Sequence, residues 1–206
     1  MPQIDIYRLS RLAFAEVTGW RAMLQELRRD QKYAFLGYAP LRKGAVKLLR
    51  LPDRESDDEI RGEIVAGAKN AAWVSRNLRA YQVFKSQFAP QLMTCEEVFM
   101  GRWAEMPGIP FVGDVELVGG PHFSARGADG RTKFVYLHPA TSWRPREIDA
   151  FCELLCYSVA ERFGAGPPEV WFLSLAQGHR ISYRPKKRVL KRCREAAELL
   201  FGSAMI

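Results

Sequence analysis

The most regular alternation of polar and apolar residues in this chain covers positions 111–118, Phe-Val-Gly-Asp-Val-Glu-Leu-Val. Successive side chains of a strand point to opposite faces, so a strand over this segment places Asp114 and Glu116 on one face. A loop rich in Gly and Asp over 119–131 leads to a second segment of strand composition at 133–138. The pattern predicts two strands joined by a long loop.

A long helix is predicted directly after these strands. Pro145 stands where a first helical residue is favoured, and the helical pattern ends at Gly164. Glu153 and Tyr157 are four residues apart on this helix and therefore share a face.

The first ninety residues carry apolar positions at helical spacing. One helix is predicted over 6–30, with an extended or irregular piece at 33–40 and a short helix over 41–51. Ser56 and Glu59 have the spacing of a capping box, which predicts the start of one long helix that runs to 84–88 and is closed by Pro90.

The remaining segments complete an α/β (α+β) pattern. A first strand is predicted over 96–103 and a turn over 106–110, and two further strands follow at 170–175 and 180–183. Pro185 begins a final helix that runs to about residue 200. We expect a single domain over 1–206, with a helical portion at 1–90 and a sheet core with the C-terminal helix at 91–206.

The net charge of the chain indicates which classes of molecule it binds. The chain has 206 residues and a formal net charge of +8. This balance favours polyanions, chiefly nucleic acid, as partners, and a merely basic surface explains the charge equally well. No apolar run approaches the roughly 20 residues of a membrane span. The N-terminal segment lacks the pattern of a signal peptide, so we expect a cytoplasmic protein that does not enter a membrane.

The four cysteines indicate a reducing compartment rather than a disulfide scaffold. Cys152 and Cys156 are four apart on the predicted helix, and no Cys-x-x-Cys pair of a zinc ribbon is present. Buried free thiols are the favoured interpretation, and an iron–sulfur cluster that uses all four cysteines is the alternative.

The order of elements resembles the RecB-like branch of the PD-(D/E)XK nucleases, over about residues 7–200. That family opens with a Ser-x-Leu-like helix, matched here by Ser10 to Leu12, and continues with a Gly-containing helix, matched by Lys43 to Leu48. Its strand motif Gly-x-x-Asp-Leu-Val corresponds to Gly113-Asp-Val-Glu-Leu-Val118, so Glu116 falls in the slot of the metal-binding aspartate. The resemblance implies a restriction-endonuclease-like central mixed sheet flanked by helices.

The later motifs of that family are altered in this chain. Tyr136 and His138 stand in the carboxylate and lysine slots of the Asp/Glu-x-Lys motif, and Glu153 with Tyr157 matches the Gln-x-x-x-Tyr of the helix. The resemblance implies a Mg²⁺- or Mn²⁺-dependent phosphodiesterase with Glu116 as ligand, Asp114 or Glu153 as a second carboxylate, and His138 polarising water or phosphate. Because a tyrosine and a histidine replace the carboxylate and the lysine, the metal–lysine site is incomplete.

Each of these residues also has a structural interpretation. Glu116 is equally explained as a solvated strand residue. His138 is also explained as a hydrogen-bonded histidine at a strand end. Glu153 is also explained as a helix residue bonded to Tyr157 or Arg146. Trp143, in a turn beside two arginines, stacks on a base or covers the edge of the core.

Basic residues crowd the start of the last predicted helix. Six of them form the predicted nucleic-acid contact: Arg180, Arg184, Lys186, Lys187, Arg188 and Lys191. Cations near a helix N-terminus oppose the helix dipole, and a phosphate backbone passing there would offset this repulsion. The leading hypothesis is a nuclease-fold protein that acts on or binds nucleic acid, with DNA favoured. The alternative is an inactive scaffold for protein partners in a DNA repair or defence assembly.

Overall fold

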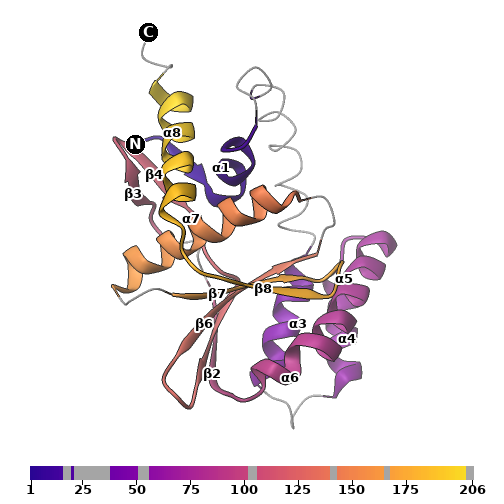
Figure 1. The fold of residues 1–206 in the computed structure, drawn as a ribbon. Helices are drawn as coiled ribbons and strands as arrows, with labels where there is room; N and C mark the ends of the chain where they lie inside the picture. The colour runs from indigo at the N-terminus through magenta and orange to yellow at the C-terminus, as the bar shows by residue number, and fades with distance from the viewer. Residues whose placement is uncertain are drawn as a thin grey trace.

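The computed structural model describes residues 1–15, 20, 38–50, 56–101, 106–139, 143–164 and 168–202. Within these residues the protein is a mixed α/β structure, as the sequence predicts (Figure 1). The sequence predicted one central mixed sheet flanked by helices; the structure has two mixed sheets, and the larger one has helices on both faces.

The larger of the two sheets, the main sheet, has five strands in the order β2-β5-β6-β7-β8. Its parallel pair is β6 and β7, connected through a long helix, and every other neighbouring pair is antiparallel. The strands are β2 (Cys95–Met100), β5 (Phe123–Gly127), β6 (Thr132–His138), β7 (Glu169–Ser174) and β8 (His179–Tyr183). The predictions of β2, β6, β7 and β8 are confirmed, whereas β5 lies in the segment predicted as a loop.

The smaller sheet has three strands in the order β1-β4-β3. Its strands are β1 (Gln3–Asp5), β3 (Ile109–Val112) and β4 (Val115–Val118). The N-terminal strand β1 pairs in parallel with β4, so the first ninety residues contribute a strand as well as helices.

The predicted single strand over 111–118 is instead the end of β3, a turn and the whole of β4, which form a hairpin. Gly113 has a φ of +51°, and Val112 pairs with Val115 across the two-residue turn Gly113-Asp114. Such turns need positive φ to match the twist of the strands, and glycine adopts it without steric strain. Asp114 therefore lies in the turn and does not share a strand face with Glu116.

One face of the main sheet is covered by the helical layer, α3 to α6 (Figure 1). Val135, Trp171 and Leu173 point from the sheet into this layer, where they pack with Tyr81 and Phe84. The helices are α3 (Ala39–Arg50), α4 (Asp57–Gly67), α5 (Ala71–Val83), a π-helix (Phe84–Phe88) and α6 (Ala89–Leu92). The helix predicted over 41–51 is confirmed as α3.

The long helix predicted from Ser56 to 84–88 is interrupted. Its capping box of Ser56 and Glu59 is present, but the helix ends at Gly67 and a new one begins at Ala71. Asn70 causes the restart, because its side chain accepts a hydrogen bond from the Trp73 amide and caps α5.

The opposite face of the main sheet is covered by α7 (Pro145–Phe163), which begins at the predicted proline and ends at Gly164 with φ +60°. The small sheet, α1 (Ile6–Leu12) and α8 (Lys187–Gly202) pack beyond α7 (Figure 1). The predicted helix over 6–30 is described only as α1, since most of the remainder lies outside the described residues. Within the described part of the chain, every helix is too short or too polar to cross a membrane.

Candidate functional site

Glu116 lies on β4, on the strand face opposite the core. Val115 and Leu117 point inward and are buried, whereas Glu116 is partly exposed and accepts a 2.9 Å hydrogen bond from Gln3 Nε2. A Cβ atom added to Gly108 would lie 2.6 Å from Glu116 Oε2, so the carboxylate packs closely on this glycine. Asp114 is exposed in the adjacent turn.

His138, the last residue of β6, is 5% exposed. Its ring packs against Trp143, with centroids 4.8 Å apart, and against Phe172 at 5.0 Å. Loss of hydration lowers its pKa to about 4, so the imidazole is neutral at physiological pH. Its Nε2 atom is buried and has no hydrogen-bond partner among the residues that the structure describes.

The sequence gave two interpretations of Trp143, stacking on a base and packing at the edge of the core. In the structure Trp143 is buried. It contacts Tyr7, His138 and Phe151 at centroid distances of 4.8–5.2 Å. The core interpretation is therefore confirmed.

Glu153 is 3% exposed on α7, and its Oε2 accepts hydrogen bonds from the Tyr183 hydroxyl and the Lys186 amide. Burial raises the pKa of this carboxyl, and the two hydrogen bonds partly oppose that shift. The carboxylate thus joins α7 to the chain that enters α8. Its partners are neither Tyr157 nor Arg146, and the Tyr157 hydroxyl instead donates to the Pro110 carbonyl.

These carboxylates do not fit a Mg²⁺ or Mn²⁺ centre, which needs convergent oxygen ligands. Glu116 faces outward from the small sheet, Asp114 is in a turn, and Glu153 is enclosed between α7 and α8. Among the described residues no three His, Cys, Asp or Glu side chains are grouped to hold a metal ion. We therefore assign no catalytic step to a metal.

A different group of side chains lies where β5 and β6 pair, on the face of the main sheet that α7 covers. His122, which directly precedes β5, stacks on Tyr136 with ring centroids 4.2 Å apart and planes 26° apart. Arg42 of α3 acts electrostatically on both rings. Protonation of His138 would oppose protonation of His122. We call these four residues the imidazole cluster: Arg42, His122, Tyr136 and His138.

The surroundings of the imidazole cluster lower the pKa of both of its histidines, so neither is protonated near neutral pH. Burial, with smaller contributions from Arg42 and His138, holds the pKa of His122 well below its usual value. Burial also raises the pKa of the Tyr136 phenol, so it keeps its proton. Arg42, His122 and Tyr136 are each only partly buried, so this end of the cluster remains open to solvent.

The sequence placed Tyr136 and His138 in the motif but did not single out Arg42 or His122. His122 was missed because its strand was interpreted as a loop. The available signal was the alternation Phe-Ser-Ala-Arg directly after it, in which Phe123 and Ala125 are buried.

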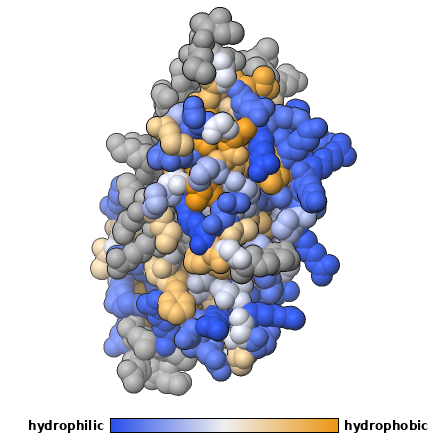
Figure 2. Space-filling model, turned by 90° about the vertical axis from the view of Figure 1, so that its left-hand side faces the viewer, coloured by the Kyte–Doolittle hydropathy of each residue, from blue (hydrophilic) through white to orange (hydrophobic). Residues whose placement is uncertain are grey.

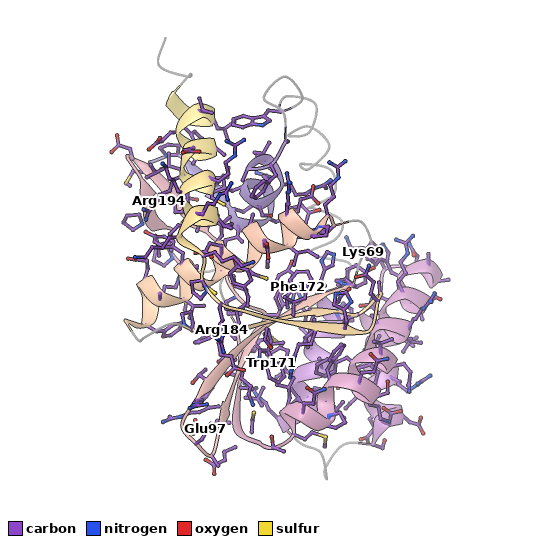
Figure 3. All side chains as sticks on the ribbon, in the orientation of Figure 1. Lys69, Glu97, Trp171, Phe172, Arg184 and Arg194 are labelled. Atoms are coloured by element: carbon purple, nitrogen blue, oxygen red, sulfur yellow. The ribbon has the colours of Figure 1, made fainter. Side chains whose placement is uncertain are left out.

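The six predicted nucleic-acid contacts fall into two sets. Lys186 bonds both carboxylate oxygens of Asp149 at 3.1 Å. Lys191 lies 4.0 Å from Glu195. Arg180 donates a hydrogen bond to Gln91 and stacks over the ring of Trp171. The other three are exposed and, within the part of the chain that the structure describes, form no ion pair: Arg184, Lys187 and Arg188. We call these three the basic segment; Figure 3 shows Arg184 where the chain leaves β8.

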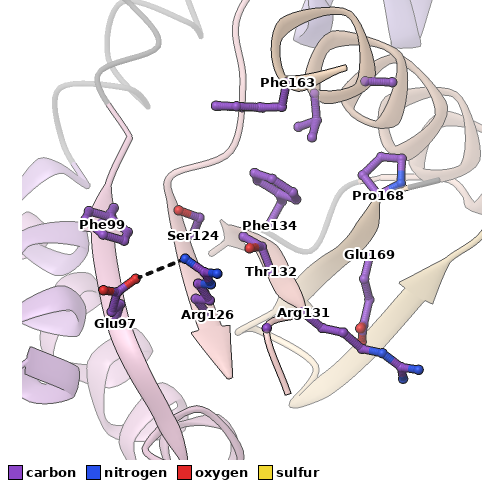
Figure 4. Close-up of a pocket in the computed structure, with 13 residues that line it drawn as sticks. Glu97, Phe99, Ser124, Arg126, Arg131, Thr132, Phe134, Phe163, Pro168 and Glu169 are labelled. Carbon is purple, nitrogen blue, oxygen red and sulfur yellow. Dashed lines mark ion pairs between the residues drawn. The ribbon is translucent and has the colours of Figure 1, made fainter. Parts of the chain in front are cut away.

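A groove of about 700 Å³ lies between the C-terminal end of α7 and the β2-β5-β6 part of the main sheet (Figure 4). Phe99 and Phe163 line it while remaining 54% and 52% exposed. Glu97 and Arg126 approach each other to 3.8 Å across the strands. The molecular face that includes this end of α7 carries apolar patches among hydrophilic side chains (Figure 2).

Three of the cysteines are buried and free, as favoured from the sequence: Cys152, Cys156 and Cys193. Burial raises the pKa of each thiol, to about 12 for Cys156 and Cys193. Cys95 is free and only partly buried.

Comparison of the chain with protein-family models found no matching family, and searches of curated proteins and of solved structures found no significant match.

Proposed function

We propose that this protein binds nucleic acid through its basic segment, and that its fold is a diverged form of the nuclease-like architecture in which the metal-dependent site has been lost. The observation that carries this proposal is the basic segment itself. Arg184, Lys187 and Arg188 lie within five residues, are exposed, and are not neutralised by any carboxylate among the described residues.

The surroundings of the basic segment support a phosphate backbone as its ligand. Lys186 and Lys191 already pair with acidic residues, and Arg180 is held by Gln91 and Trp171. The three cations of the basic segment are therefore the ones available to an external anion. Contacts of this kind neutralise phosphates without reading bases, so they predict salt-sensitive binding with little dependence on sequence.

The succession β6, α7 and β7, in which a helix connects two parallel strands of a mixed sheet, supports the nuclease-like fold. His138 and Tyr136 lie on β6, on the sheet face covered by α7, and α7 carries Glu153 and Tyr157. We infer that β6 and α7 correspond to the elements of the family motif, although among the described residues the carboxylates do not converge into a metal site.

Fluorescence anisotropy with a labelled duplex and a labelled single strand tests this function. The variant R184A/K187A/R188A is expected to lose most of the binding seen at low salt. The matched control is K43A/K69A/R79A, which removes three exposed cations of the helical layer, away from the basic segment. Undetectable binding by the wild-type protein at low salt, or equal losses in the two variants, would refute the proposal.

The groove beside Phe99 and Phe163 favours a second candidate, the scaffold for a protein partner. Its Glu97 and Arg126 pair with each other, and Arg131 lies 3.6 Å from Asp129. Because these charges are already paired, the groove suits an apolar side chain of a partner protein. Substitution of both phenylalanines by serine would then abolish partner binding while nucleic-acid binding by the basic segment is unchanged.

A further inference from the structure

The floor of the groove beside α7 is formed by two rows of side chains on β2 and β5. Glu97 and Phe99 are two residues apart on β2, so they share a face of the strand. Their partners across the strands are Arg126 and Ser124 of β5. All four side chains line the groove (Figure 4).

The row that contains Phe99 places a projecting ring next to a small residue. Phe99 is 54% exposed, and the residue opposite it on β5 is Ser124. Beyond Ser124 lies Phe134 of β6, on which the ring of Phe163 stacks with centroids 5.6 Å apart. The short serine side chain therefore leaves a hollow between Phe99 and this stacked pair. An exposed aromatic ring gains free energy when a partner surface removes it from water.

The row that contains Glu97 carries one charge of each sign. Arg126 Nη1 lies 3.8 Å from Glu97 Oε2, and the two side chains are 56% and 50% exposed. An exposed ion pair of this kind contributes little to stability, so its members can exchange this contact for another one. The row is neutral as a whole and matches a surface that presents the same two charges in the reverse order.

Both rows are complementary to themselves under a two-fold rotation. An axis that runs along the strands between β2 and β5 turns each row onto the same row of a second copy. This rotation places Phe99 over Ser124 of the second copy and Glu97 opposite Arg126 of the second copy, and each contact occurs twice. A partner with charges of only one sign would attract one member of the charged row and repel the other.

We propose that this groove is the contact surface of a homodimer, with a second copy of the chain as its occupant. The exposed ring of Phe99 is then removed from water in both copies, which stabilises the dimer. Such a dimer rests on the second candidate function only in assigning the groove to a protein, and it is independent of nucleic-acid binding by the basic segment.

Sedimentation velocity of the full chain over a series of concentrations tests this dimer. Nucleic acid is removed and thiols are kept reduced, so that neither nucleic acid nor a disulfide through Cys95 links two copies. We expect an equilibrium between monomer and dimer, and we expect Phe99→Ser to weaken it by roughly 100-fold, because two rings are lost from each dimer. The matched control is Val65→Ser, which changes a 45% exposed apolar residue of α4 and should leave the equilibrium unchanged. A wild-type chain that is monomeric at every concentration, or equal effects of the two variants, would overturn the proposal.

Charge reversal tests the contact between the two copies directly. Glu97→Arg and Arg126→Glu each place like charges opposite one another, so each variant alone is expected to dimerise more weakly than the wild type. An equimolar mixture of the two variants is expected to form a heterodimer, since every charge across the contact then faces its opposite. The ion pair within each copy stays broken in this mixture, so recovery reports a contact between copies. Absence of recovery overturns the proposal even if Phe99→Ser does not fold.

The dimer and the proposed function can fail separately. The variant R184A/K187A/R188A is expected to keep the dimer, because the basic segment does not line the groove. A dimeric wild type that binds no nucleic acid refutes the proposed function alone. A monomeric wild type that binds nucleic acid refutes the dimer alone and leaves the groove to a different protein partner.

Discussion

The hydroxyl of Tyr183 donates a 2.9 Å hydrogen bond to the buried carboxylate of Glu153, and this contact joins the edge strand β8 to the middle of α7. The same carboxylate oxygen accepts from the Lys186 amide, one residue before α8 begins. A residue that the family resemblance places in a catalytic slot thus serves here to hold α8 against α7.

Tyr183→Phe is expected to lower the free energy of unfolding by about 1.5–3 kcal/mol, because it removes a hydrogen bond to a buried acidic group. Urea denaturation measures the loss. Tyr157→Phe is the matched control, since its hydroxyl donates to the neutral Pro110 carbonyl at a more exposed position and should contribute only about 0.5–1.5 kcal/mol. Equal losses in the two variants would contradict the role given to Glu153.

Stability is expected to fall on acidification because of His138. Its pKa is lowered to about 4 in the folded protein, whereas the unfolded chain titrates near the ordinary histidine value of about 6.5. The unfolded state therefore binds more protons between these values, and the contribution of His138 to stability, present above the unfolded pKa, is lost as pH falls through this window. Between pH 7 and 5 the loss amounts to about 2 kcal/mol.

Urea denaturation of the variant His138→Phe at both pH values isolates this contribution. Phenylalanine suits the aromatic surroundings and does not titrate, so the variant should lose about 2 kcal/mol less than the wild type over the same interval. His179→Gln, an exposed histidine on β8, should behave as the wild type. An acid sensitivity that is unchanged in His138→Phe would show that other groups cause it.

Nucleic-acid binding by the basic segment is expected to have a measurable salt signature. The logarithm of the binding constant for duplex DNA falls linearly with the logarithm of salt concentration, with a slope of about −0.9 for each neutralised phosphate. If Arg184, Lys187 and Arg188 each contact one phosphate, their removal makes the slope less negative by about 2.7. A variant that binds more weakly with an unchanged slope would indicate that these residues act through the fold.

The hairpin that places Asp114 in a turn depends on Gly113. An added Cβ at Gly113 meets nothing within 4 Å, so Gly113→Ala tests conformational strain at φ +51° alone. The substitution is expected to destabilise the protein by about 1–2 kcal/mol. Gly62→Ala is the control, because this helical glycine also has open space around it and alanine there should stabilise by about 0.5–1 kcal/mol. Thermal or urea unfolding of both variants measures the difference in sign.

Elements with strong local signals were predictable from the sequence. Pro145 and Gly164 bounded α7, and the capping box of Ser56 began α4, because backbone geometry at helix ends depends on a few adjacent residues. The failures involved weaker local signals. Gly113 appeared as one position in an alternating run, β5 is a short strand next to a segment rich in Gly and Asp, and β1 is a short strand whose partner β4 lies far along the chain.

Some features of the candidate site were likewise predictable from the sequence and others were not. The amino-acid sequence by itself determined the positive charge of the chain, the basic character of the residues after β8, and the placing of Tyr136 and His138 on one strand, since these depend on composition and on the period of a strand. Only the tertiary structure decided that Asp114, Glu116 and Glu153 lie apart and that Arg42 and His122 join Tyr136 and His138. These relationships depend on which strands and helices pack together, and packing joins residues that no local pattern connects.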